Sequence, residues 1–305
     1  MNAVETGHLL KRFGAVTAVD DISITVPEGG IFGFLGPNGA GKTTTMRLLT
    51  GVLTPDSGTV RINDIDIHRH PLDAKMLMGV IPENSTVYGD LSAEQNLHLS
   101  GQMYGMPRAI REKRVGEILS RMGLSEKRRL PVRTFSKGMK QRVSIGCAIM
   151  HRPKVLFLDE PTSGLDVQSR RLVIDTIRDM NEQGSTIFLT THNIEEANTL
   201  CQIVCIINKG KIVAQDSPER LKKMFDTTRS VEVSFDRTVT PDFFVDEGIL
   251  RAEPCGDKWR LYTDDPDRVL KEVVRRAEQA SLGIAALATS GPSLEEAFVQ
   301  LTGCA

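Results

Sequence analysis

One eight-residue segment restricts the possible folds of this chain more than any other stretch: Gly36-Pro37-Asn38-Gly39-Ala40-Gly41-Lys42-Thr43. It matches the phosphate-binding pattern G-x-x-x-x-G-K-[ST] at every specified position. The apolar run before it, residues 31–35, is typical of a buried strand, and the residues after it have helical spacing. A strand, a glycine-rich loop and a helix in this order predict a binding site for a nucleoside triphosphate.

The chemistry expected of this loop follows from its residue types. Gly36, Gly39 and Gly41 allow backbone conformations closed to other residues, so that successive N–H groups can point at phosphate oxygens. The helix that follows adds the positive end of its dipole. Lys42 is expected to reach the β- and γ-phosphates, and the Thr43 hydroxyl to ligate Mg²⁺. The alternative, a glycine-rich turn with an incidental lysine, does not explain the flanking strand and helix.

Composition narrows the class of protein. A chain of 305 residues is long enough for one large domain plus a small one, or for two medium domains. Hydrophobic content of 40% and charged content of 25% are those of an ordinary globular protein. The formal net charge of −1 argues against a dedicated nucleic-acid binder, which is normally basic. We therefore expect no nucleic-acid partner.

The sequence shows no membrane segment of its own. No apolar run approaches the ~18 residues that a membrane helix needs. The first residues have neither the basic nor the apolar region of a signal peptide. We therefore expect a cytoplasmic protein, which would work at a membrane only through a partner.

Candidate metal ligands are few. The cysteines form no C-x-x-C pair and are expected to be buried free thiols. Cys201 and Cys205 are the nearest pair, but core packing is favoured over a metal site because no second ligand cluster lies near them. His68 and His70 precede a proline and have no acidic partner at ligand spacing, which favours a solvated loop.

Buried strands alternate with helical patterns along most of the chain. Residues 154–158 and 186–191 are apolar runs of strand length, which predicts a largely parallel sheet with ligand bound at the carboxyl ends of its strands. The first run ends in Asp159 and Glu160, and the second leads into His192. We expect these three side chains to converge on the phosphate loop.

Two regions depart from that alternation. Residues 84 to about 150 predict a helical insertion, with a capping box from Ser92 to Gln95. Residues 228–305 predict a separate small α+β domain, with a hairpin and an amphipathic helix. The expected fold is therefore an α/β P-loop NTPase core in residues 1–224, with an antiparallel β subdomain and a helical subdomain, followed by the small domain.

Three motifs in order carry a resemblance to a known family. The phosphate loop is followed by Phe135-Ser136-Lys137-Gly138-Met139-Lys140-Gln141-Arg142 and then by Val155-Leu156-Phe157-Leu158-Asp159-Glu160. Ser163-Gly164-Leu165-Asp166 and the single His192 come after them. Over residues 8 to about 224, the chain resembles the nucleotide-binding subunit of an ABC transporter. The joint match is far more specific than any one motif.

The resemblance implies a catalytic role for Lys42, Glu160 and His192. Glu160 matches the general base that polarises the attacking water, and His192 matches the histidine that contacts the γ-phosphate. Asp159 matches the carboxylate that holds Mg²⁺ through water, and the phosphate loop extends to Thr44. The chemistry agrees, because phosphoryl transfer needs positioning and charge neutralisation more than covalent catalysis.

Other roles implied by the resemblance lie further from the loop. Phe13 matches the aromatic side chain that stacks on adenine, although packing on a sheet would explain it equally well. In the family, Ser136 and Gly138 cap the γ-phosphate of ATP bound to the opposite protomer. Asp166 lies where the two protomers cross. The resemblance thus implies a head-to-tail dimer around two ATP molecules, and we expect a homodimer.

The sequence departs from the family pattern at two places. The signature segment begins Phe-Ser-Lys-Gly-Met where Leu-Ser-Gly-Gly-Gln is usual. Glu83 takes the place of a glutamine, and an ionised carboxylate can sense Mg²⁺ but cannot donate a hydrogen bond. Both variants look like those of exporters whose membrane domain is a separate ABC-2-type chain. The ending from Pro292 to Gly303 resembles drug-export ATPases, with an ordinary amphipathic helix as the alternative.

The leading hypothesis is an ATPase that drives export through a separate integral-membrane permease, at the cytoplasmic face of the cell membrane. Glu83, Tyr88 and Leu91 mark the expected contact with that permease. One alternative is a soluble ABC ATPase with a non-transport role, but chromosome-type arms would need heptad inserts that are absent. Another is a regulatory binding module, in which ATP gates the C-terminal domain.

Overall fold

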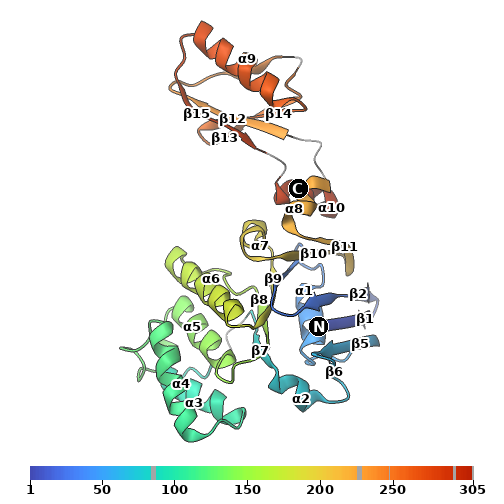
Figure 1. Cartoon of the computed structure of the whole chain (residues 1–305), viewed down its shortest axis with the longest axis vertical. Helices are drawn as coiled ribbons and strands as arrows, with labels where there is room; N and C mark the ends of the chain where they lie inside the picture. Colours follow the sequence, from blue (N-terminus) through green and yellow to red (C-terminus); the bar gives the residue numbers. More distant parts are fainter. Residues whose placement is uncertain (84–86, 225–228, 247, 291–292, 304–305) are drawn as a thin grey trace. The chain divides into compact units, whose positions relative to one another are not determined.

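The computed structural model describes residues 1–83, 87–224, 229–246, 248–290 and 293–303. Its contacts divide the chain into two compact units, residues 1–217 and residues 218–305 (Figure 1). The start of the expected helical insertion, the residues between the two expected domains and Pro292 of the C-terminal ending lie outside the described residues. No described helix is both long enough and apolar enough to cross a membrane.

A six-stranded sheet forms the centre of the first unit. Its order is β11 (Lys211–Asp216), β10 (Ile203–Asn208), β4 (Ile31–Leu35), β9 (Thr186–Thr191), β8 (Val155–Asp159) and β7 (Met78–Ile81). All neighbouring strands are parallel except β11, which is antiparallel to β10. Every residue of β4, β8 and β9 is buried, as expected for central strands covered on both faces. The predicted parallel core is confirmed.

Four phenylalanines hold the middle of this sheet together. The Phe188 ring on β9 lies 5.3 Å from that of Phe32, 5.7 Å from that of Phe34 and 5.7 Å from that of Phe157, measured between centroids. Offset aromatic contacts of this kind favour one register of β4, β8 and β9. The carboxyl ends of these three strands are therefore held at a common edge.

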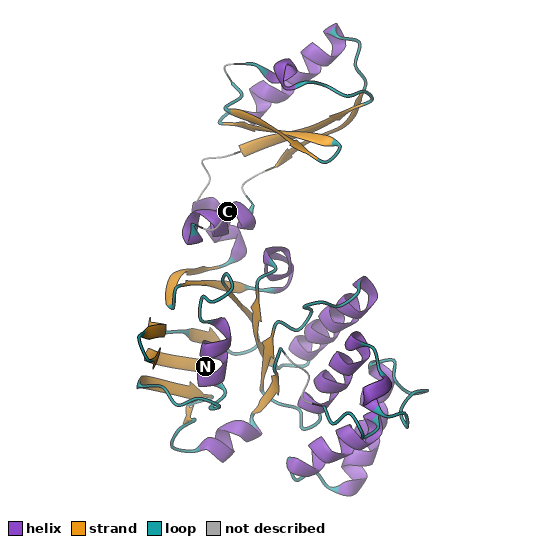
Figure 2. Ribbon diagram, turned by 180° about the vertical axis from the view of Figure 1, so that it is seen from behind, coloured by secondary structure: helices purple, strands orange, loops and turns teal. Residues whose placement is uncertain are grey.

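A second, antiparallel sheet confirms the expected β subdomain. It consists of β1 (Asn2–Phe13), β2 (Val16–Ile22), β3 (Thr25–Pro27), β5 (Ser57–Ile62) and β6 (Ile65–Asp66). Helix α1 (Lys42–Leu49) contacts β2 and β5 of this sheet and β8 and β9 of the parallel sheet, so it lies between the two (Figure 2). Helix α2 (Pro71–Met76) packs beside β6 and β7.

Helices make up the rest of the first unit. They are α3 (Ala93–Met103), α4 (Arg108–Arg121), the short η1 (Val132–Thr134), α5 (Lys137–Ala148), α6 (Val167–Glu182) and α7 (Ile194–Leu200). The predicted capping box is confirmed, because Ser92 and Gln95 exchange side chain–backbone hydrogen bonds at the start of α3. Helix α3 packs on α4 and α5, which together form the helical subdomain (Figure 1).

The second unit contains a four-stranded antiparallel sheet. Its order is β13 (Arg251–Cys255), β14 (Lys258–Thr263), β12 (Arg229–Phe235) and β15 (Ile284–Ser290), and it includes the expected hairpin. Helix α9 (Pro266–Gln279) and the short η2 (Pro241–Phe244) share an apolar core with it. Helices α8 (Pro218–Met224) and α10 (Leu294–Thr302) pack on each other. The contacts thus group α8 with residues beyond the expected boundary at 224.

Candidate active site

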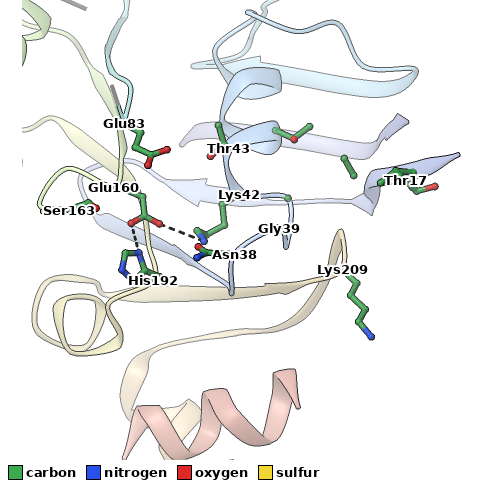
Figure 3. Close-up of a pocket in the computed structure, with 14 residues that line it drawn as sticks. Thr17, Asn38, Gly39, Lys42, Thr43, Glu83, Glu160, Ser163, His192 and Lys209 are labelled. Atoms are coloured by element: carbon green, nitrogen blue, oxygen red, sulfur yellow. Dashed lines mark hydrogen bonds and ion pairs between the residues drawn. The ribbon is translucent and has the colours of Figure 1, made fainter. Parts of the chain in front are cut away.

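A cavity of about 600 Å³ opens at the carboxyl edge of the parallel sheet (Figure 3). Its walls come from the β1–β2 region, the phosphate loop, and the segments that follow β7, β8, β9 and β10. The lining residues are Val16, Thr17, Ala18, Asn38, Gly39, Gly41, Lys42, Thr43, Thr44, Glu83, Glu160, Ser163, His192 and Lys209. This is the edge at which ligands of open α/β sheets bind.

The phosphate loop is pressed against neighbouring backbone, which explains its glycines. A Cβ on Gly36 would lie 2.5 Å from the carbonyl oxygen of Ile207. Gly41 has a φ of +109°, and a Cβ there would lie 2.4 Å from the carbonyl oxygen of Ala18. Any larger residue at either position would push the loop away from the strand ends. The loop conformation therefore depends on packing as well as on its own sequence.

Lys42, at the first position of α1, folds back over the loop. Its ammonium donates hydrogen bonds to the carbonyl oxygens of Gly36, at 2.7 Å, and Pro37, at 3.2 Å. Only 6% of the residue is exposed. A cation held this way lies at the wall of the cavity, where it can meet phosphate oxygens.

Glu160 and His192 meet at the same wall. The Glu160 carboxylate lies 3.6 Å from the Lys42 ammonium, and its other oxygen is hydrogen-bonded to Nδ1 of His192 (Figure 3). Glu160 has a φ of +50°, and its N–H donates to the carbonyl oxygen and the hydroxyl of Thr190, at 3.1 and 3.2 Å. A non-glycine residue in the left-handed region is strained, which is common at functional sites. The structure thus brings the three predicted catalytic side chains together.

Asp159 lies behind this wall. It is 3% exposed, and Oδ1 accepts a hydrogen bond of 2.5 Å from the Thr190 hydroxyl. The described residues include no cluster of three or more His, Cys, Asp or Glu side chains that could enclose a metal. Mg²⁺ usually takes only one or two carboxylates together with substrate phosphates and waters. The oxygen donors Asp159, Thr43 and Glu83 fit that mode of binding.

Comparison with known proteins decides the family. The family model described as ABC transporter matches residues 19–163. The Nod factor export ATP-binding protein I of Ralstonia nicotianae is 36% identical over 97% of this chain and 92% of its own length. The linearmycin resistance ATP-binding protein LnrL of Bacillus subtilis is 33% identical over 98% of both chains. The chain belongs to the ABC transporter ATP-binding subunits. It is therefore an ATP hydrolase.

Solved structures agree with this assignment. A structure described as the ATP binding subunit of an ABC transporter shares 29% identity with a TM-score of 0.69, covering 73% of this chain and 93% of that chain. The structure of cbiO1 from Clostridium perfringens, part of the ABC transporter complex cbiONQ, has a TM-score of 0.66 at 26% identity, covering 72% and 90%. The fold of the ABC ATPases thus accounts for about three quarters of the chain.

Ser136, Gly138 and Asp166, the residues expected to act across a dimer, do not line the cavity of their own chain. Ser136 is exposed and caps α5 by accepting a hydrogen bond from the Met139 N–H, at 3.3 Å. Asp166 caps α6, and its carboxylate accepts from the N–H and hydroxyl of Ser169, at 2.8 and 2.9 Å. A Cβ on Gly138 would lie 2.2 Å from the Ser169 hydroxyl oxygen. Gly138, Asp166 and Ser169 therefore form one packed cluster within the chain.

Phe13 lies at the turn between β1 and β2, close in sequence to the lining residues Val16 and Thr17. Half of it is exposed, so the residue is not enclosed in a sheet core. The Lys11 ammonium lies 5.8 Å from the centroid of its ring. The exposed half of the ring is free to contact a base.

Sequence reasoning missed several lining residues. Lys209 comes directly after β10, and Ser163 lies in the turn four residues after the end of β8, so both follow strands of the parallel sheet. The rule that ligands bind at the carboxyl ends of parallel strands contained the signal for both. Val16, Thr17 and Ala18 carried no such signal, since they enter the wall from the antiparallel sheet.

The structure also describes the cysteine pair and the histidine pair that were not expected to bind a metal. Cys201 and Cys205 are buried free thiols, and burial raises the pKa of both. Core packing is therefore confirmed for this pair. His68 and His70 are exposed, as expected of a solvated loop.

Proposed function

We propose that this ATPase drives export through a separate integral-membrane permease of the ABC-2 type, at the cytoplasmic face of the cell membrane. Relatives that match almost the whole chain support this, because their names refer to Nod factor export and to linearmycin resistance. The doxorubicin resistance ATP-binding protein DrrA of Mycobacterium tuberculosis, 33% identical over 95% of this chain, points the same way. The match extends through the C-terminal unit, which favours a transport subunit over a non-transport ABC ATPase.

The observation that carries the proposed chemistry is the contact of Glu160 with both Lys42 and His192. The loop N–H groups and Lys42 hold the phosphates of ATP. Glu160 takes the proton of the attacking water, and His192 holds the Glu160 carboxylate in place. Thr43, Asp159 and Glu83 would hold Mg²⁺, which would supply positive charge to neutralise the phosphates.

We propose a head-to-tail homodimer as the active form. Ser136 stands exposed at the start of α5 and does not line its own cavity. In the dimer, its hydroxyl and the N–H groups of the first turn of α5 cap the γ-phosphate of the partner's ATP. Gly138 allows that turn to pack tightly on Ser169, and Asp166 caps the neighbouring helix.

The permease is proposed to dock near the end of β7. Tyr88 is 59% exposed, while Leu91 is half-buried. A second candidate surface lies by the start of β7, where a groove of about 570 Å³ opens between α2, the α3–α4 turn and residues 150–152. Its lining includes the exposed apolar side chains Met76 and Ile110, beside the basic Lys113 and Arg152, while Arg114 in the same lining is paired with Glu117 at 3.4 Å. This combination fits a permease segment that presents apolar side chains and an acidic group.

The experiment that tests the proposed function compares Glu160→Gln with the wild type by size-exclusion chromatography in Mg²⁺ and ATP. Loss of a general base should reduce turnover by roughly 10²–10⁴-fold. The variant should then accumulate as an ATP-bound dimer, whereas Glu160→Gln combined with Lys42→Ala should not. Unchanged hydrolysis would show that Glu160 is not the base. Lost hydrolysis without a dimer would contradict the homodimer.

A further inference from the structure

One buried carboxylate joins the two segments that carry Glu160 and His192. Oε1 of Glu196, on α7, accepts a hydrogen bond of 2.9 Å from the Thr162 hydroxyl. Oε2 accepts one of 2.9 Å from the Thr191 hydroxyl. All three residues are buried, and none of them is more than 7% exposed. We call Glu196, Thr162 and Thr191 the carboxylate bridge.

Each threonine of the bridge lies close in sequence to a catalytic side chain. Thr162 follows Glu160 by two residues, in a turn where the Ser163 N–H donates to the Glu160 carbonyl oxygen at 3.1 Å. Thr191 is the last residue of β9 and directly precedes His192. A shift of either segment therefore changes the distance between the Glu160 carboxylate and the His192 ring.

The central residue of the bridge is a carboxylate, although its site is buried. A buried carboxylate loses hydration, and burial raises the pKa of Glu196, while the hydrogen bonds from Thr191 and Thr162 act in the opposite direction. The charge of Arg170 also lowers the pKa of Glu196, although among the described residues no basic side chain forms an ion pair with Glu196 within 4.0 Å. A simple packing role would be filled at lower cost by an apolar side chain. Two hydroxyl donors, however, need two acceptors, and a carboxylate supplies both.

A second hydrogen bond restrains the same turn, from another helix. The Gln141 amide, on α5, donates a hydrogen bond of 3.2 Å to the carbonyl oxygen of Pro161, between Glu160 and Thr162. Gln141 is itself buried. The turn after β8 is thus hydrogen-bonded to both α5 and α7.

We propose that Glu196 is a positioning residue for ATP hydrolysis, which holds the Glu160 and His192 segments in one arrangement through Thr162 and Thr191. This rests on the proposed roles of Glu160 and His192. Glu196 does not line the cavity and acts only through these two side chains. Its loss should therefore affect the chemical step much more than the binding of ATP.

The test measures kcat and KM for ATP in Glu196→Ala, Glu196→Gln and the control Glu195→Ala, which alters the exposed neighbour on the same helix. For Glu196→Ala, kcat should fall about tenfold to a hundredfold, as expected for a small misplacement of catalytic groups, with KM nearly unchanged. Glu196→Gln keeps one acceptor oxygen and should lose less. Glu195→Ala should match the wild type.

A double-mutant cycle distinguishes the positioning role of Glu196 from a purely structural one. If Glu196 acts through His192, Glu196→Gln should lower kcat little further once His192→Ala is present. Full additivity of the two losses, or an unchanged kcat in a folded Glu196→Ala, overturns the proposal. Should Glu196→Ala not fold, Thr162→Val removes one of the two hydrogen bonds to Glu196 at nearly constant volume. Thr191→Val removes the other, together with the bond that its hydroxyl accepts from the Asn193 N–H. Unchanged kcat in both variants overturns the proposal equally.

Glu160→Gln, measured alongside, separates this inference from the proposed function. If Glu160→Gln abolishes hydrolysis while the Glu196 variants stay fully active, only the bridge is wrong. If Glu160→Gln stays fully active, the proposed base is wrong and the bridge falls with it.

Discussion

The Glu160 carboxylate lies 3.6 Å from the Lys42 ammonium, with 11% of the Glu160 side chain and 6% of the Lys42 side chain exposed. Glu160, which would polarise the attacking water, and the phosphates of ATP would therefore compete for the same Lys42 ammonium. Glu160 must yield that cation, at least in part, when a triphosphate enters the cavity.

The first prediction is that Glu160→Gln binds ATP more tightly than the wild type. Removing a competing charge that contributes about 1 kcal/mol should lower the dissociation constant of a non-hydrolysable ATP analogue about fivefold. Isothermal titration calorimetry measures it, with Glu195→Gln as a control for loss of a nearby exposed charge. Equal or weaker binding by Glu160→Gln would contradict the competition for Lys42.

The second prediction concerns the packing of α5 on α6. Gly138→Ala should destabilise the protein by about 1–3 kcal/mol. The new alanine Cβ would lie 2.2 Å from the Ser169 hydroxyl oxygen and 2.7 Å from the Ser169 Cβ. Urea unfolding measures the loss. Ser169→Gly in the same chain removes both contacts and should restore part of the stability. Gly116→Ala, where a Cβ meets nothing within 4 Å, is the matched control. No rescue by Ser169→Gly would show that the clash is not the cause.

The third prediction is a pH dependence from His151. Burial lowers its pKa from 6.5 to about 4, its ring stacks on Tyr104 at 3.5 Å, and among the described residues its Nδ1 has no hydrogen-bond partner. Its other nitrogen donates to the Met78 carbonyl oxygen at 2.9 Å. As the pH falls from 6.5 towards 4, the unfolded chain binds a proton that the folded chain does not bind. The free energy of unfolding should therefore fall, by up to about 3 kcal/mol.

Urea unfolding at about pH 7 and about pH 5 measures this loss, which begins below the ordinary histidine pKa. His151→Gln can still donate to the Met78 carbonyl oxygen and should show a smaller decrease than the wild type. His70→Gln, at an exposed histidine, should retain the full decrease. An identical decrease in all three proteins would exclude His151 as its source.

The fourth prediction tests the permease contact. Tyr88→Asp places a charge on an exposed side chain and should weaken co-purification with the permease and the permease-stimulated ATPase activity, while ATP binding stays unchanged. Val245→Asp, at an exposed apolar residue of the second unit, is the control. Intact complex formation and transport in Tyr88→Asp would place the docking surface elsewhere.

Local chemistry made much of this protein predictable. The strand, loop and helix around Lys42 follow from a combination of residue types that is typical of a phosphate site. The start of α3 follows from Ser92 and Gln95, which lie three residues apart and form its capping box. The parallel sheet follows from apolar runs that end in Asp159 and His192. The Glu160 contacts could be expected only in outline, because the sequence places their partners at one edge without giving distances.

The sequence by itself determined the elements and the identity of the phosphate loop, because these depend on neighbours within a few residues. The tertiary structure alone decided which distant side chains touch. Glu196 contacts Thr162, which lies 34 positions earlier in the chain. Helix α8, the first helix of the second unit in sequence, packs on α10, the last. Such contacts depend on strand register and helix packing, which sum many weak interactions over the whole fold and leave no local pattern.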